Sequence, residues 1–290
     1  MSDKKLIVLF AVFVLIWSSG FIVGRMIVGS VSPNIFLAIR FFGTAVLFFG
    51  IALLLKKQCP KFSEIPKHMV VGFLCNGIYL GGSYWAINHG MPAGIMALLG
   101  GLQPLITLVF GSVLFGERFK IDYIWGIIVG LFGVYLALPS SHQSPNQSYD
   151  FLVFLISVLS IVCITVGLLF QKYYIKSSEL ITSLVIQNLS GALMSVILAT
   201  VLKESTFYVN FDFLFSLFWA VLVLSGVGVY LLMYLTKNHN AVKTTSLMLL
   251  CPPLAAIQAN LLFDERLSLL QILGFAIALF GVALCQKVKA

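Results

Sequence analysis

The sequence predicts an all-α integral membrane protein with ten transmembrane helices, arranged as two inverted five-helix repeats. Three observations lead to this prediction. The chain is 60% hydrophobic and only 10% charged, with a mean hydropathy of +1.05, so a water-soluble domain would have too little charged surface. Its apolar stretches have lengths that suit a bilayer. The second half of the chain also repeats the pattern of the first.

Ten apolar stretches account for most of the chain, and nearly all reach the roughly 17–25 residues that a transmembrane helix needs. They cover about 6–25, 34–55, 69–88, 93–115, 123–138, 151–170, 180–202, 213–236, 243–262 and 269–286. The first stretch follows Lys4 and Lys5, as a signal peptide would. It continues through Trp17 and Phe21 without a small-residue cleavage site, so we expect it to be retained as a helix.

One long segment occurs twice. Residues 93–136 match residues 241–284 without gaps, and 15 of the 44 positions are identical. Shared leucines are common in an apolar chain, but this match also preserves a proline, a Glu-Arg pair and glycines. These pairs are Pro104/Pro252, Glu117/Glu265, Arg118/Arg266, Gly126/Gly274 and Gly133/Gly281. A period of 148 residues indicates two half-domains and not a solenoid.

The duplication predicts a first repeat at 1–138 and a second at 151–290, joined on the outer side by a Pro- and Ser-rich linker at 139–150. Because each repeat has an odd number of spans, the second enters the membrane from the opposite side. The repeats are then related by a pseudo-two-fold axis in the membrane plane. Exchanging their conformations would move an opening from one face to the other, which is alternating access.

The basic residues lie mainly on one side of the predicted membrane. With the N-terminus inside, fourteen Lys and Arg residues fall on the inner segments and only Arg25, Lys203 and Arg266 on the outer ones. This distribution predicts a multi-pass protein of the inner (cytoplasmic) membrane with both termini in the cytoplasm. The net charge of +8 thus reflects orientation in the lipid bilayer, and we expect no nucleic-acid partner.

No pattern of catalytic or metal-binding residues stands out. The five cysteines and four histidines are scattered and form neither a C-x-x-C nor an H-E-x-x-H motif. A nucleophile elbow and a phosphate loop are also absent from the sequence. The sequence therefore predicts no enzyme, no cofactor and no metal site.

Three short segments carry a resemblance to a known family. They are Trp17-Ser-Ser-Gly-Phe21, Arg40-Phe41 and the repeated proline that is followed by Phe-x-Glu-Arg. Together they resemble the ten-helix EamA-type transporters of the drug/metabolite transporter (DMT) superfamily, and the resemblance covers nearly the whole chain. It implies an inner-membrane secondary transporter that moves a small organic metabolite, an amino acid or a related solute, by export or exchange.

Arg40 is the one formal charge well inside a predicted span. A charge near the membrane centre costs about 2.5–3.5 kcal/mol on insertion scales. No Asp or Glu lies inside any predicted span to pair with it. Arg40 either snorkels to the outer interface, or binds helix-end carbonyls or an anionic group of the substrate. Its approximate counterpart in the second repeat is the uncharged Gln187.

Other polar side chains within the spans are candidates for lining a substrate cavity. Asn76, Tyr79 and Ser83 are spaced i, i+3, i+7, which places them on one helical face. Tyr84 and Trp85 beside them are candidates for an interfacial aromatic belt. The full set of expected substrate-binding residues is Trp17, Ser19, Arg40, Asn76, Tyr79, Ser83, Gln103, Tyr230 and Tyr234. Helix packing is an alternative role for the same polar positions.

Two prolines interrupt equivalent spans. Pro104 and Pro252 free backbone groups that only protein or a water-filled cavity can satisfy, and paired breaks of this kind point to a central binding site. Glu117 and Glu265 lie at the membrane faces, where they either fix turns or take part in gating. The glycines of the fifth and tenth spans allow close helix contact, either within the fold or across a homodimer.

Two other functions stay open at this point. Proton-coupled multidrug efflux would call for a titratable group in the membrane, but all acidic residues lie in loops or at span ends. His89, at the outer end of the third span, is then the titratable candidate near a cavity, unless it simply faces water. A non-transporting membrane scaffold or sensor would need loops for a partner, and none is longer than about a dozen residues.

Overall fold

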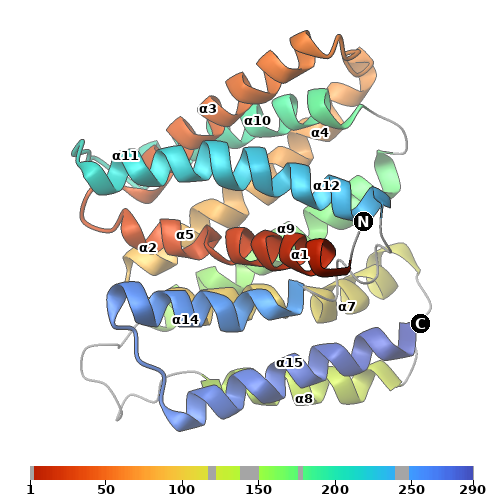
Figure 1. Cartoon of the computed structure of the whole chain (residues 1–290), viewed down its shortest axis with the longest axis vertical. Helices are drawn as coiled ribbons and strands as arrows, with labels where there is room; N and C mark the ends of the chain where they lie inside the picture. The colour runs from red at the N-terminus through yellow and green to blue at the C-terminus, as the bar shows by residue number, and fades with distance from the viewer. Residues whose placement is uncertain (1–2, 117–121, 138–149, 176–178, 239–247, 290) are drawn as a thin grey trace. The chain divides into compact units, whose positions relative to one another are not determined.

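The computed structural model describes residues 3–116, 122–137, 150–175, 179–238 and 248–289. Within these ranges the elements are helices, as Figure 1 shows. The one extended pairing among the described residues is an isolated bridge between Val31 and Phe207. The helices long and apolar enough to cross a membrane are Val8–Met26, Pro33–Leu54, Phe62–Asn88, Ala93–Leu114, Phe151–Tyr174, Leu180–Val201 and Phe211–Leu232. The shorter apolar helices are Tyr123–Ala137, Met248–Phe263 and Leu269–Leu284.

These seven long and three short helices fall at the ten stretches expected from the sequence. The chain is therefore an all-helical, multi-pass membrane protein over the part that the structure describes. Ten crossings of the bilayer stay a prediction, because the three short helices have 10–17 residues each.

The chain forms two compact units, and each unit draws on both halves of the sequence. Unit 1 consists of Met1–Ile22, His89–Phe154 and Val227–Ala290, and unit 2 consists of Val23–Asn88 and Leu155–Gly226. The expected linker at 139–150 lies almost entirely outside the described residues. The structural units are thus not the two sequence repeats themselves.

Unit 1 is a set of helices that pack through small residues. They are α1 (Asp3–Ser18), α6 (Ala93–Gly101), α7 (Gln103–Phe115), α8 (Asp122–Ala137), α12 (Val229–Asn238), the short 3₁₀ turn η4 (Met248–Leu250), α14 (Cys251–Phe263) and α15 (Leu269–Lys289). The α2 helix (Gly20–Met26) follows α1 directly and continues into unit 2.

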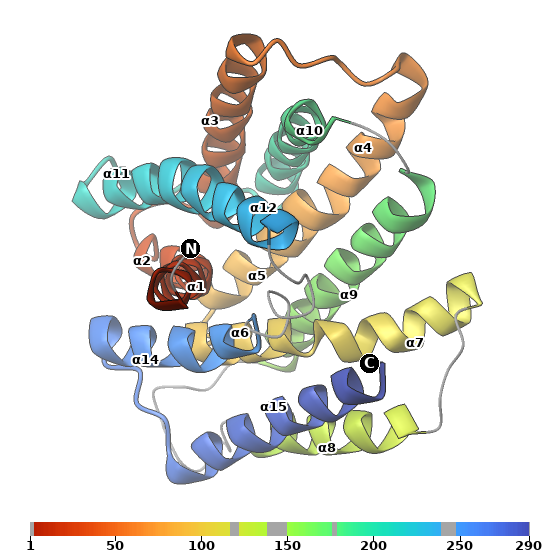
Figure 2. The same ribbon diagram turned by 45° about the vertical axis from the view of Figure 1, so that its right-hand side comes forward.

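In unit 1, α8 and α15 lie side by side and run antiparallel, as Figures 1 and 2 show. A Cβ on Gly281 would overlap the backbone of Gly130, and one on Gly274 would lie 2.5 Å from the backbone nitrogen of Ala137. A Cβ on Gly133 would overlap the backbone of Ala278. Only glycine lets the two backbones come this close. The duplicated glycines therefore serve helix contact within this unit.

A second antiparallel contact in unit 1 joins α6 to α14. A Cβ on Gly94 would lie 3.1 Å from Ala256, and one on Gly101 would lie 2.7 Å from the Pro252 ring. The order of these contacts reverses along the two helices, so they run in opposite directions. Small residues again set the distance between the helices.

Unit 2 contains longer helices and two π-helical segments. Its elements are α3 (Pro33–Leu54), η1 (Phe62–Glu64), α4 (Ile65–Gly72), the π-helix η2 (Phe73–Ile78), α5 (Tyr79–Asn88), α9 (Phe151–Tyr174), α10 (Leu180–Val201), α11 (Phe211–Phe218) and the π-helix η3 (Trp219–Gly228). The first residues of α9 and the last residues of η3 are assigned to unit 1. The elements α4, η2 and α5 follow one another without a break and form one continuous helix (Figure 2). Both π-helices interrupt equivalent spans of the two repeats, and such segments often mark functional sites.

The α3 and α10 helices pack antiparallel in unit 2, since contacts join the start of each to the end of the other. Their bounds are related by a shift of 147 residues at both ends. Both end in a left-handed residue, Lys56 with φ 50° and Lys203 with φ 53°. The backbone N–H of the next residue then donates a hydrogen bond back to the helix. Lys57 donates to the carbonyl of Ala52, and Glu204 donates to the carbonyl of the equivalent Ala199. The duplication therefore extends to the way these helices end.

Candidate functional site

Arg40 lies in the interior of unit 2, two turns into α3, and only 8% of its surface is exposed. Its Nη1 donates a hydrogen bond to the Tyr84 hydroxyl at 3.1 Å, and its guanidinium carbon lies 5.7 Å from the centre of the Phe41 ring. Its Nε is buried without a hydrogen-bond partner. Arg40 makes no ion pair with any acidic residue that the structure describes. In this conformation Arg40 is held inside the protein and does not snorkel.

Tyr84 positions Arg40, although the sequence left it as a candidate for the interfacial belt. The Tyr84 side chain on α5 is fully buried, and its ring stacks on Phe36 with 6.3 Å between ring centroids. A Cβ on Gly24 would come within 3.0 Å of the Tyr84 ring, so the glycine leaves room for it. The buried phenol can satisfy only part of a guanidinium, which carries five N–H donors.

Asn76 on η2 and Tyr79 at the start of α5 belong to the same unit as Arg40. Asn76 donates from Nδ2 to the backbone carbonyl of Gln187 at 3.1 Å, and Tyr79 interacts electrostatically with Arg40 and Tyr84. Ser83, one turn further along α5, is fully buried, and its hydroxyl has no hydrogen-bond partner among the described residues. The structure thus gathers four of the expected residues into one unit.

A second buried polar group joins α4 to α10, and it was not expected from the sequence. The His68 ring is fully buried, with Nε2 at 3.4 Å from the Ser183 hydroxyl and Nδ1 at 3.5 Å from the Gln187 side-chain nitrogen. Ser190, also on α10, donates its hydroxyl to the backbone carbonyl of Met69 at 3.0 Å. The i, i+4, i+7 spacing of the three α10 residues could have revealed this face. His89, in contrast, follows α5 and is exposed.

The remaining expected residues belong to unit 1. Trp17 on α1 is half-buried against Phe13, with ring centroids 5.5 Å apart, and Ser19 donates to the backbone carbonyl of Ile16 at 2.6 Å. Tyr230 and Tyr234 on α12 stack on each other at 6.3 Å, and Tyr230 is 63% exposed. These contacts are local to α1 and α12.

The two helix breaks meet in unit 1. The first lies between α6 and α7, at Leu102, with Gln103 and Pro104 in the first turn of α7. The second lies between η4 and α14, with Pro252 in the first turn of α14. Because a Cβ on Gly101 would lie 2.7 Å from the Pro252 ring, the two breaks touch each other. Backbone groups freed by the prolines are therefore concentrated in one place.

Glu265 closes the start of α6. Its Oε2 accepts a hydrogen bond from the backbone N–H of Ala93 at 3.1 Å. A carboxylate at a helix N-terminus is favoured by the unpaired N–H groups and the helix dipole. The equivalent Glu117 lies outside the described residues. Glu265 thus joins the end of α14 to the beginning of α6.

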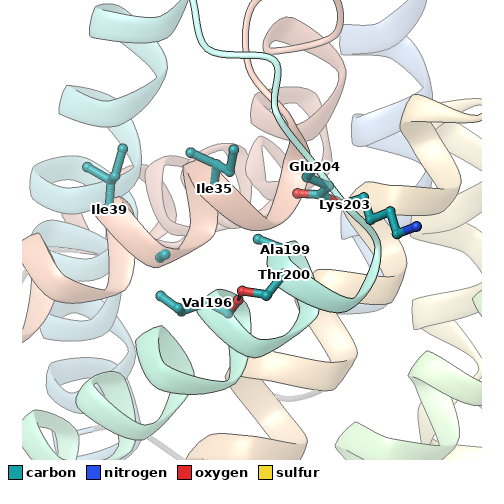
Figure 3. Close-up of a pocket in the computed structure, with 8 residues that line it drawn as sticks. Ile35, Ile39, Val196, Ala199, Thr200, Lys203 and Glu204 are labelled. Carbon is teal, nitrogen blue, oxygen red and sulfur yellow. Dashed lines mark hydrogen bonds between the residues drawn. The ribbon is translucent and has the colours of Figure 1, made fainter.

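An open groove of about 500 Å³ lies between α3 and α10 (Figure 3). It is lined by Ile35, Ala38, Ile39, Val196, Ala199, Thr200, Lys203 and Glu204. Apolar side chains from both helices form most of its wall, and Lys203 and Glu204 lie at the end of α10. None of these eight residues is among those expected to bind substrate. The groove is therefore mainly apolar.

Long apolar helices, a buried arginine and proline-broken spans are features expected of multi-pass membrane transporters. No cluster of His, Cys, Asp or Glu suited to a metal ion occurs in the described ranges. The chain belongs to the EamA-like transporter family, whose model matches it twice, at residues 4–138 and 151–285. It is thus a membrane transporter of the DMT superfamily, and such transporters take small-molecule substrates.

Several related proteins match this chain over almost the full length of both proteins. A probable amino-acid metabolite efflux pump of Escherichia coli (strain K12) is 26% identical over 285 residues, which cover 95% of this chain and 92% of that protein. A protein of the same description in Salmonella typhimurium is 23% identical, and the match covers 93% of this chain and 90% of that protein. An uncharacterized inner membrane transporter of E. coli K12, YedA, is 25% identical and covers 95% and 88%.

A solved crystal structure has a similar fold. It aligns over 100% of both chains with a TM-score of 0.65 and 16% sequence identity. At this identity the likeness concerns the fold alone.

Proposed function

We propose that this protein is an inner-membrane secondary transporter that moves a small organic metabolite, an amino acid or a related solute, by export or exchange. Transport proceeds by alternating access between two inverted five-helix repeats, and both termini lie in the cytoplasm. The names of two relatives, probable amino-acid metabolite efflux pumps, support this substrate class. The fourteen-to-three distribution of basic residues supports the orientation.

The observation that carries the mechanism is the antiparallel packing of equivalent helices. Three antiparallel contacts occur: α3 with α10 and α8 with α15 join equivalent helices, and α6 with α14 joins the equivalent spans at 93–115 and 243–262. A pseudo-two-fold axis in the membrane plane makes equivalent helices antiparallel, whereas an axis along the membrane normal would make them parallel. The matching left-handed ends of α3 and α10 give further support.

A counterflow experiment tests the function. Liposomes containing the purified protein are loaded with one unlabelled amino acid or related metabolite, and transient uptake of the same labelled compound is followed. We expect at least one compound to accumulate without a pH gradient. Exchange that requires the gradient, with lipophilic cations as the preferred substrates, would favour proton-coupled multidrug efflux. If no member of the panel is exchanged or stabilises the protein against heat, a scaffold or sensor is the better description.

A further inference from the structure

We propose that Arg40 and Tyr84 form the binding site for a carboxylate group of the substrate. The inference rests on the proposed transport function and names the chemical class of its substrate. It follows from one observation: a cation within a membrane-spanning helix is more than nine-tenths buried and lacks an anionic partner among the described residues.

The free edge of the guanidinium defines the shape of the missing partner. Tyr84 takes one hydrogen bond from Nη1, and the buried Nε, on the edge that it shares with Nη2, donates to no described residue. Two parallel N–H groups on such an edge match the two oxygens of a carboxylate, which makes this the preferred bidentate pairing of arginine. The geometry therefore suits a planar anion that approaches the Nε side.

The cost of leaving Arg40 unpaired supports the same conclusion. Removing a charge from water costs several kcal/mol even after the protein relaxes, and one phenol compensates for only part of this. A structural arginine would be expected to have its remaining donors satisfied by carbonyls or by an acid. Arg40 instead keeps a buried donor unpaired, which is the condition of a site that awaits a ligand.

The neighbourhood favours an anion over a cation. The groups near the guanidinium are phenols and an aromatic ring, namely Tyr84, Tyr79 and Phe41. None of them offers a negative charge to an ammonium group. The substrate class is therefore a small organic acid or a zwitterion, with its carboxylate at Arg40. Because Nε is buried, the site opens to such a ligand only in another conformation of the cycle.

The second repeat has no copy of this arginine site at the equivalent position. Gln187 on α10 corresponds to Arg40 on α3, but its side chain contacts His68 at 3.5 Å and is neutral. Its backbone carbonyl accepts from Asn76. The second repeat thus has no cation at this position to hold a second anionic group.

The first test needs no substrate and measures the melting temperature of the purified full-length protein in detergent. Arg40→Met removes the charge while keeping a long flexible side chain, and Gln187→Met is the matched control at the equivalent position. If Arg40 is unpaired in the ligand-free protein, Arg40→Met should melt at or above the wild-type temperature. Gln187→Met should melt lower, because it leaves His68 without its contact. A clear loss of stability in Arg40→Met would overturn the proposal and show a structural arginine.

The second test measures binding of each amino acid in the counterflow panel and of its amide. In the amide, a neutral carboxamide replaces the carboxylate. At equal concentration, the acid should raise the melting temperature of the wild type and the amide should not. Arg40→Met should weaken acid binding about 10- to 100-fold, and Arg40→Lys should weaken it less. Equal stabilisation by acid and amide, or by neither, would overturn the carboxylate site. Since binding is measured without transport, absence of counterflow alone would count against the proposed function only.

Discussion

Two antiparallel helix pairs, α8 with α15 in unit 1 and α3 with α10 in unit 2, arise from the same duplication but pack by different chemistry. Glycines bring the backbones of α8 and α15 together, with Gly281 against Gly130. The α3 and α10 helices are instead joined by polar groups at both ends. Small residues suffice to bring helices together in lipid, whereas a polar group between helices is costly unless a partner satisfies it.

The polar ends of the α3 and α10 pair are chemically unequal. At the start of α3, both oxygens of Glu204 accept from Asn34, from its backbone nitrogen at 2.8 Å and from its side chain at 2.7 Å. At the other end, Lys57 and Glu179 form an ion pair at 3.0 Å with both side chains 35% exposed. The first contact is the more buried of the two, because Asn34 is fully buried and Glu204 half-buried, so we expect it to contribute more to stability.

The largest effect is expected from a side chain placed between α8 and α15. Gly281→Leu would push into the backbone of Gly130, and we expect it to lower the free energy of unfolding by about 3 kcal/mol or to prevent folding. The measurement is the yield and melting temperature of the purified protein. Gly50→Leu on α3 is the control, because a Cβ there meets nothing within 4 Å. Equal melting temperatures for the two variants would contradict the close packing.

The next largest effect concerns the buried end of the α3 and α10 pair. Glu204→Ala leaves two donors of the fully buried Asn34 without an acceptor, which should cost about 1.5–3 kcal/mol. Glu204→Gln retains an acceptor oxygen and should lose less. A double-mutant cycle with Asn34→Ala measures the coupling between the two residues. Strictly additive losses would show that the contact does not stabilise the protein.

The smallest effect is expected at the exposed end of the same pair. Lys57→Ala should lower the free energy of unfolding by about 1 kcal/mol or less, because a partly exposed ion pair is screened by solvent. The difference from the wild type should shrink further when the ionic strength is raised from about 0.01 M to 1 M. A salt-independent loss as large as that of Glu204→Ala would mean that the two ends do not differ as described.

The sequence predicted well what depends on composition and duplication. The apolar stretches, the break before Pro104 and the glycines of α8 and α15 could be recognised because each has a local signature or a copy in the other half. The matching bounds of α3 and α10 follow from the same repeat. Burial of Arg40 could only be stated as one of two alternatives, because snorkelling depends on neighbouring helices.

The contacts that sequence reasoning missed depend on the direction in which side chains point. The expected stripe of Asn76, Tyr79 and Ser83 assumed α-helical spacing, but η2 is a π-helix through Ile78, which shifts the faces before α5 begins. Tyr84 therefore could not be assigned to the interior from spacing alone. His68 is one of four scattered histidines in the sequence, and only packing against α10 shows that it is buried.

The most direct test of the inverted repeats compares two equivalent exposed positions. Gln58 follows α3 and Ser205 follows α10, with the same shift of 147 residues that relates the two helices. Each is changed to cysteine in a variant that lacks the five native cysteines, and intact cells are treated with a membrane-impermeant thiol reagent. The account predicts labelling of Ser205→Cys from outside, and of Gln58→Cys only after the membrane is opened. Labelling of both positions from the same face would contradict the inverted arrangement.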